Sequence, residues 1–166
     1  MQKIKNIFVD MDGVLADFVK GVTGPKYLNG PLVDENTYDD RKIELSNRGL
    51  FLDLPKMPDM DLLINHIKTM GVYWEILTCS GTLNRKKVMQ DKIAWIKKHI
   101  HPMPVVTGTL KGKHKGIYAA PGHVLIDDRQ DNIHAWVMNG GQGILHKNAE
   151  CTIKRLKLLQ VAQKTA

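Results

Sequence analysis

Residues 4–15 read IKNIFVDMDGVL, and the fold that we expect follows from this stretch. Residues 4–9 are mostly apolar and β-favouring, which predicts a short β-strand. Two aspartates, Asp10 and Asp12, come directly after this run, and Gly13 follows them. A short apolar run that ends in turn residues is typical of a strand buried on both faces of a parallel sheet.

Four further apolar runs of this kind occur along the chain, at residues 73–77, 105–106, 124–126 and 143–145. Between and after them, apolar residues recur at helical spacing in four segments, 60–67, 88–100, 133–137 and 153–159. Strands that alternate with helices pair in parallel through right-handed crossovers. We therefore predict an α/β fold of the Rossmann-like type, in which helices cover both faces of an open parallel sheet and give three layers.

Residues 19–56 fit this alternation poorly. They contain several Gly, Pro, Asn and Asp residues and one candidate helix, around residues 39–48. We predict that they form a small cap, inserted into a core made of residues 1–18 and 57–166. A chain of 166 residues is long enough for one such domain and its insertion.

The net charge of +7 is unevenly distributed. Residues 83–115 contain nine basic residues and one acid, Asp91. A basic segment attracts anions, so a phosphate-bearing substrate or a nucleic acid is one interpretation. A solvated, lysine-rich helix face is the other interpretation, and it suits most of these residues better.

The sequence contains no apolar run long enough to cross a membrane, and its first residues lack the apolar stretch of a signal peptide. We therefore expect a cytoplasmic protein that has no membrane partner. The two cysteines, Cys79 and Cys151, have no metal-binding spacing and are too few for a disulfide framework. Both are expected to be reduced.

Polar residues gather at the carboxyl ends of three predicted strands: Asp10 and Asp12, Thr78 and Ser80, and Asp127 and Asp128. In an open α/β sheet, ligands bind at this edge. Crowded carboxylates resist joint ionisation, and a hard divalent cation removes that conflict. Mg²⁺ prefers oxygen ligands and is commonly shared between carboxylates and a substrate phosphate. The pattern therefore predicts Mg²⁺ and a phosphorylated substrate.

These residue types fit one kind of phosphate chemistry. A carboxylate can attack phosphorus and form an aspartyl-phosphate, while a second acid protonates the leaving oxygen and later deprotonates water. A hydroxyl and a lysine would offset the charge of the transferred group. The candidates are Asp10, Asp12, Thr78 and a lysine among residues 111–115. The alternative is structural, because such residues also form turns, cap helices and satisfy backbone groups.

Three segments resemble the motifs of the haloacid dehalogenase superfamily of phosphatases. Residues 10–15 (DMDGVL) resemble its first motif, residues 76–78 (ILT) its second, and residues 125–128 (LIDD) its fourth. They occur in the family's order, and the likeness extends over residues 4–145. Three ordered motifs, each at a predicted strand end, are more specific than any one alone.

The closer resemblance is to the 5'(3')-deoxyribonucleotidase family. Residues 10–18 (DMDGVLADF) are similar to the opening of that family, and residues 49–58 (GLFLDLPKMP) are similar to its passage from cap to core. The resemblance implies a magnesium-dependent 5'-nucleotidase that hydrolyses nucleoside monophosphates, with cap residues around the nucleoside.

The resemblance also implies roles for individual residues. Asp10 would be the nucleophile and a Mg²⁺ ligand. Asp12 would be the acid/base, and its backbone carbonyl would also bind the metal. Asp128 matches the remaining metal ligand of the protein, and Asp127 its supporting neighbour.

Two hydroxyls and one aromatic residue match substrate-binding positions: Thr78 and Ser80 for the phosphate, and Phe18 for the substrate pocket. The family's third motif is a lysine shortly before the strand of the paired acids. Three lysines qualify by position, namely Lys111, Lys113 and Lys115. We favour Lys115, because a candidate helix at residues 116–120 then leads into the strand.

The sequence leaves three functions open. The first is a nucleotidase acting on deoxyribonucleoside monophosphates. The second is a phosphatase of nucleic-acid ends, such as a 3'-phosphate, with residues 83–115 on the polynucleotide backbone. The third is a non-catalytic protein that binds nucleic acid or a partner on a phosphatase-like scaffold, although such a protein has no need of Asp10 and Asp12.

Overall fold

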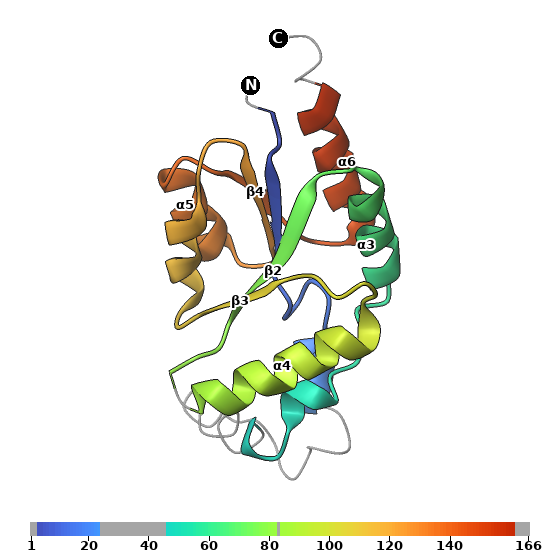
Figure 1. The fold of residues 1–166 in the computed structure, drawn as a ribbon, viewed down its shortest axis with the longest axis vertical. Coiled ribbons are helices and arrows are strands. Elements are labelled where there is room, and N and C mark those ends of the chain that lie inside the picture. The colour runs from blue at the N-terminus through green and yellow to red at the C-terminus, as the bar shows by residue number, and fades with distance from the viewer. Residues whose placement is uncertain (1–2, 24–45, 83, 162–166) are drawn as a thin grey trace.

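The structure is a computed structural model that describes residues 3–23, 46–82 and 84–161 (Figure 1). Within these residues, five strands form one parallel sheet in the order β3-β2-β1-β4-β5. The strands are β1 (Asn6–Val9), β2 (Tyr73–Cys79), β3 (Val106–Thr109), β4 (His123–Asp127) and β5 (Gln142–Leu145). The predicted α/β fold with an open parallel sheet is confirmed.

Helices cover both faces of this sheet. They are α1 (Phe18–Thr23), η1 (Leu50–Leu52), α3 (Met60–Thr69), α4 (Arg85–His99), η2 (Gly112–Tyr118), α5 (Gln130–Met138) and α6 (Ala149–Val161), where η marks a 3₁₀ helix. In Figure 1, α5 lies on one side of the sheet and α3 and α6 lie on the other, which gives the three expected layers. None of the helices in the described part of the chain is both long and apolar enough to span a membrane.

The strands are apolar on both faces because each face packs against helices. Successive side chains of a strand point to opposite faces. In β1, Ile7 and Val9 join the larger apolar cluster, which includes α3 and α6 residues, while Phe8 joins the smaller one beneath α5. The buried residues of β2 and β4 divide between the two clusters in the same way, so all three central strands place apolar side chains on both faces.

The order of the strands places the first and fourth strand ends together. The chain runs from β1 to β2 and β3 on one side, then returns to β4 and β5 on the other. Ligands of open α/β sheets bind at the carboxyl edge where the order reverses in this way. Val9 pairs with Ile126 in the register of β1 and β4, so Asp10 and Asp127 are neighbours at that edge.

Most of the predicted cap, residues 19–56, lies outside the described residues, as does most of the candidate helix at residues 39–48. The described parts that flank it pack on the main core. Val22 of α1 and Leu50 of η1 are both buried in the larger apolar cluster. The cap as a separate unit therefore stays a prediction.

Candidate active site

A tight loop after β1 brings two aspartates to the edge of the sheet. The backbone N–H of Asp10 donates to the carbonyl of Ile126 at 2.9 Å, which ties the loop to β4. Gly13 then adopts a left-handed conformation, with φ of 79°, and donates its N–H to Ala16 at 2.8 Å. A Cβ at Gly13 would overlap the carboxyl group of Asp128, so glycine allows the loop to approach that carboxyl closely.

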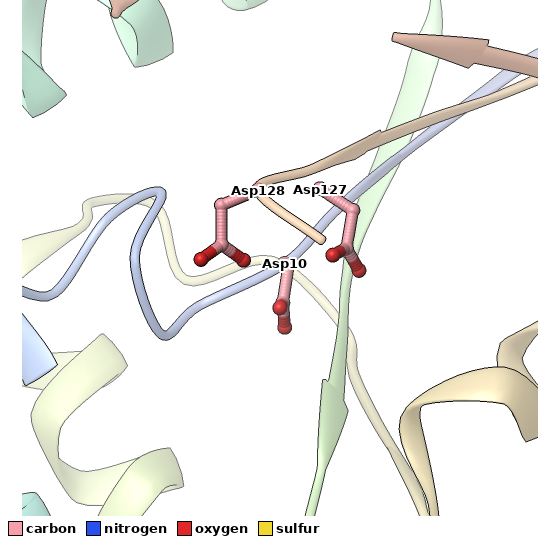
Figure 2. A group of neighbouring side chains, drawn as sticks. All are labelled: Asp10, Asp127 and Asp128. Carbon is pink, nitrogen blue, oxygen red and sulfur yellow. The ribbon is translucent and has the colours of Figure 1, made fainter. Parts of the chain in front are cut away.

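Three carboxyl groups meet where β1 and β4 end. Asp10, Asp127 and Asp128 each offer one oxygen, and these oxygens lie within 4.8 Å of one another. Figure 2 shows Asp10 between the other two, with all three side chains pointing the same way. Asp10 and Asp127 are buried, whereas Asp128 is exposed to solvent.

One of the three candidate lysines lies at this cluster. Lys115 in η2 is buried, and its Nζ lies 2.8 Å from Oδ1 of Asp10 and 2.5 Å from Oδ2 of Asp127. Burial alone would lower the pKa of Lys115, but the charges of Asp10 and Asp127 raise it above its ordinary value. Lys111 and Lys113 are exposed. Of the three candidate lysines, the geometry favours Lys115.

Asp127 is surrounded by donors and is held in place by them. Its Oδ1 accepts from the backbone N–H of Arg129 at 2.9 Å and from Nδ2 of Asn132 at 3.0 Å, and its Oδ2 accepts from Lys115. Burial and the charge of Asp10 raise the pKa of Asp127, and Lys115 counteracts this. These contacts fix the carboxyl group of Asp127, and its role as support for a metal ligand stays a prediction.

Asp128 is compensated less fully, because a backbone hydrogen bond and the charge of Lys115 lower its pKa but do not outweigh the causes that raise it. Although the residue as a whole is exposed, partial burial of its carboxyl group, followed by the negative charges of Asp10 and Asp127, raises the pKa of Asp128 to about 6. No salt bridge reaches it from the residues that the structure describes. An acid that is hard to ionise beside two others is suited to bind a cation.

The other acid of the loop, Asp12, lies against a lysine that our sequence analysis missed. Lys92 of α4 has a fully buried side chain, and its Nζ lies 2.5 Å from Oδ2 of Asp12. It also donates to Oγ1 of Thr78 at 2.9 Å and to the carbonyl of Cys79 at 2.8 Å. The sequence did contain a signal, because helical spacing from the buried Val88 and to the buried Ile96 places Lys92 on the inner face of α4.

The two hydroxyls at the end of β2 have different surroundings. Thr78 is fully buried beside Lys92. Ser80 donates its hydroxyl to the carbonyl of Thr109 at 2.9 Å, which favours the alternative that it satisfies a backbone group. Its binding of phosphate stays a prediction.

Phe18 is half-buried and packs against the core. Its ring stacks on that of Phe51, with 6.0 Å between ring centroids. This contact accounts for the residue without a ligand, so its role in a substrate pocket also stays a prediction.

The charges of the site leave room for a divalent cation. Four carboxylates, those of Asp10, Asp12, Asp127 and Asp128, face two ammonium groups, those of Lys92 and Lys115. The difference, four minus two, is two negative charges. Asp10 and Asp128 would hold Mg²⁺ best, because Asp127 and the side chain of Asp12 are already engaged by lysines.

Neither a family model nor a curated protein matches the chain. Several solved structures match it in fold. A haloacid dehalogenase-like family hydrolase from Xanthomonas campestris has a TM-score of 0.60 and 12% identity, with 100% of both chains covered. A hydrolase from Streptococcus pneumoniae has a TM-score of 0.55 and 16% identity, over 95% of this chain and 100% of the other. A hydrolase from Pseudomonas syringae has a TM-score of 0.53 and 11% identity, over 93% and 98%.

At these identities the likeness establishes the fold. The chain has the fold of the haloacid dehalogenase-like hydrolases, with its acidic cluster at the carboxyl edge of the sheet. That fold is the one that the three motifs of the sequence predicted.

Proposed function

We propose that the chain is a Mg²⁺-dependent phosphomonoesterase of the haloacid dehalogenase superfamily that forms an aspartyl-phosphate on Asp10. The observation that carries the proposal is that one oxygen of this carboxylate is held by the protein and the other is not. Its Oδ1 is held by Lys115 and by the backbone N–H of Met11, both at 2.8 Å. Oδ2 has no such partner among the described residues, which leaves one oxygen free to attack.

The reaction has two steps. Oδ2 of Asp10 attacks phosphorus, the bond to the leaving oxygen breaks, and Asp12 gives that oxygen a proton. A water molecule then attacks the phosphorus, Asp12 takes a proton from it, and the bond to Asp10 breaks to release phosphate. Lys115 and the hydroxyl of Thr78 offset the charge on the transferred group. When bound, Mg²⁺ would add positive charge beside the phosphoryl oxygens.

For the substrate, we propose nucleoside monophosphates, as in the 5'(3')-deoxyribonucleotidases. The support is the resemblance of residues 10–18 and 49–58 to that family. Both cysteines are free, in keeping with the reducing cytoplasm where such an enzyme would act.

A second candidate substrate is a phosphorylated nucleic-acid end, and one observation favours it. Of the nine basic residues in the segment 83–115, six are exposed: Arg85, Lys86, Lys97, Lys98, Lys111 and Lys113. Contacts with a polynucleotide backbone would make activity fall steeply with salt. A mononucleotidase has few such contacts and would depend on salt much less.

Phosphate release from a panel of substrates, with Mg²⁺ or with EDTA, tests both candidates. The panel holds 5'- and 3'-deoxyribonucleotides, ribonucleotides, sugar phosphates and 3'-phosphorylated oligonucleotides. Mg²⁺-dependent release from deoxyribonucleotides supports the nucleotidase, and a salt-sensitive preference for oligonucleotides supports the end-phosphatase. No release from any ester, by protein that is folded and supplied with Mg²⁺, would contradict the phosphatase and leave a binding protein.

A further inference from the structure

We propose that Lys92 is a positioning residue that decides which oxygen of Asp12 transfers the proton. The inference rests on the proposed phosphatase function, in which Asp12 is the acid and base. It assigns to Lys92 a role distinct from that of Lys115, since Lys92 touches Asp12 while Lys115 touches Asp10.

The ammonium group of Lys92 is fully engaged within the protein. A lysine ammonium has three donors and no acceptor. Here the three acceptors are Oδ2 of Asp12 at 2.5 Å, Oγ1 of Thr78 at 2.9 Å and the carbonyl of Cys79 at 2.8 Å. The side chain is 0% exposed, and Nζ lies 4.7 Å from the centre of the Phe51 ring. Lys92 therefore cannot bind a substrate phosphate without giving up one of these partners.

The contact makes the two oxygens of Asp12 unequal. Oδ2 faces a group that can only donate, so a proton on Oδ2 would point at another proton. Oδ1 is buried and has no hydrogen-bond partner in the described part of the chain. A buried polar atom without a partner is costly unless a ligand supplies one. The acid form of Asp12 therefore carries its proton on Oδ1, and the substrate oxygen meets that atom.

The same lysine orients the hydroxyl of Thr78. Because Oγ1 accepts from Lys92, its own O–H must point elsewhere, and no described acceptor takes it. That proton is left for a phosphoryl oxygen. One ammonium group on α4 thus orders two groups that come from different strand ends.

Oδ1 of Asp12 can carry out both proton transfers of the reaction. In the first step Oδ1 gives its proton to the leaving oxygen as the bond between that oxygen and phosphorus breaks. In the second step Oδ1 takes a proton from the attacking water. The contact with Lys92 at Oδ2 persists through both steps, so Asp12 needs no rotation between them.

The test compares Lys92→Met with the wild type on two esters, an alkyl phosphate such as a deoxynucleoside 5'-monophosphate and p-nitrophenyl phosphate. The nitrophenolate leaves readily without a proton, whereas an alkoxide needs one. The value of kcat/KM reports the steps through departure of the leaving group. We expect a loss of roughly 100-fold or more for the alkyl ester, the scale of general acid catalysis. The loss for the aryl ester should be smaller by at least about tenfold.

Equal losses for both esters would overturn the proposal, because a merely structural lysine would affect them alike. If the wild type hydrolyses neither ester, the proposed function itself fails, which is a separate result. Lys154→Met is the matched control, since Lys154 is an exposed lysine of helix α6, outside the basic segment 83–115, and it should leave both values near the wild type.

A second variant and a measurement on the wild type test the proposal even if Lys92→Met does not fold. In Lys92→Gln, the amide carbonyl can accept a proton from Oδ2, so the same unequal loss is expected. In wild-type protein labelled with ¹⁵N-lysine, two ammonium signals should exchange slowly with water, from the buried Lys92 and Lys115. A single slow signal that is lost in Lys115→Met, or no slow signal at all, would contradict the three contacts of Lys92.

Discussion

The ammonium group of Lys115 lies 2.8 Å from Oδ1 of Asp10, and both side chains are buried at the carboxyl edge of the sheet. The contact pairs Asp10 with a cation and occupies one of its two oxygens. A nucleophile that is charged, fixed and free on one side is what an attack on phosphorus requires.

Asp10→Asn should abolish turnover while leaving the protein folded. The amide is a poor nucleophile, yet it has nearly the shape of the carboxylate. Lys115 keeps Asp127 as its second partner at 2.5 Å, so the variant leaves no unpaired buried charge. Phosphate release and thermal unfolding measure the two outcomes. Substantial turnover by this variant would exclude the aspartyl-phosphate mechanism.

Lys115→Met should both inactivate and destabilise the protein. It leaves Asp10 and Asp127 buried without a cation, and breaking a buried ion pair in this way costs about 3–5 kcal/mol. Urea unfolding in EDTA measures the cost. Adding Asp127→Asn should restore part of the stability but not the activity.

Lys113→Met is the control, because Lys113 is an exposed lysine of the same helix η2. It should leave both stability and turnover nearly unchanged. If the two variants, Lys115→Met and Lys113→Met, lost activity to the same small extent, the third-motif lysine would have been misplaced.

The sequence predicted the central strands well because both of their faces are apolar. The edge strand β3 was harder to predict from the sequence. It spans Val106–Thr109, but only residues 105–106 indicated it. Its later residues are polar or glycine, so an apolar pattern cannot mark them. The helix expected at residues 116–120 is η2, which begins earlier, at Gly112, in a stretch of glycines and lysines without apolar periodicity.

In the site, the sequence identified the carboxylates at the strand ends, but it missed one of the two buried lysines. Asp10, Asp127 and Asp128 meet because parallel strands end at one edge, which motif positions alone can predict. Lys92 looked like a solvent-exposed lysine in a basic helix, since lysine is rarely buried without a partner. Its carboxylate partner Asp12 is 80 residues away, so no local pattern could reveal the pair.

Without metal, the stability of the protein should fall as the pH rises from about 4 to about 6. The pKa of Asp128 is about 6 in the folded protein, above its unfolded value of about 3.9, so the folded state binds its proton more tightly. The contribution of this proton to the free energy of unfolding is complete below the pKa that Asp128 has in the unfolded protein. It is lost as the pH rises past the pKa that Asp128 has in the folded protein. Urea unfolding in EDTA should show this slope, and Asp128→Asn should flatten it. An equal slope in the variant would assign the effect to other groups.

Mg²⁺ binding should have the opposite pH dependence. The metal needs the ionised carboxylate, so each pH unit below about 6 should weaken the apparent affinity by up to about tenfold. Isothermal titration calorimetry across this range measures the affinity directly. An affinity that does not change with pH would remove Asp128 from the set of ligands.

Gly13→Ala should weaken Mg²⁺ binding more than its effect on stability alone would suggest. A Cβ at this position would overlap the carboxyl group of Asp128 and must displace it. Gly13 also has a φ of 79°, so alanine adds about 1–2 kcal/mol of backbone strain. Gly140→Ala isolates that strain, because Gly140 has a φ of 86° and no atom within 4 Å of the added Cβ. Both variants should lose similar stability in urea, whereas the loss of Mg²⁺ affinity should be confined to Gly13→Ala. Equal affinities in the two variants would mean that Asp128 can move aside without cost, and that it is not fixed for a metal by this loop.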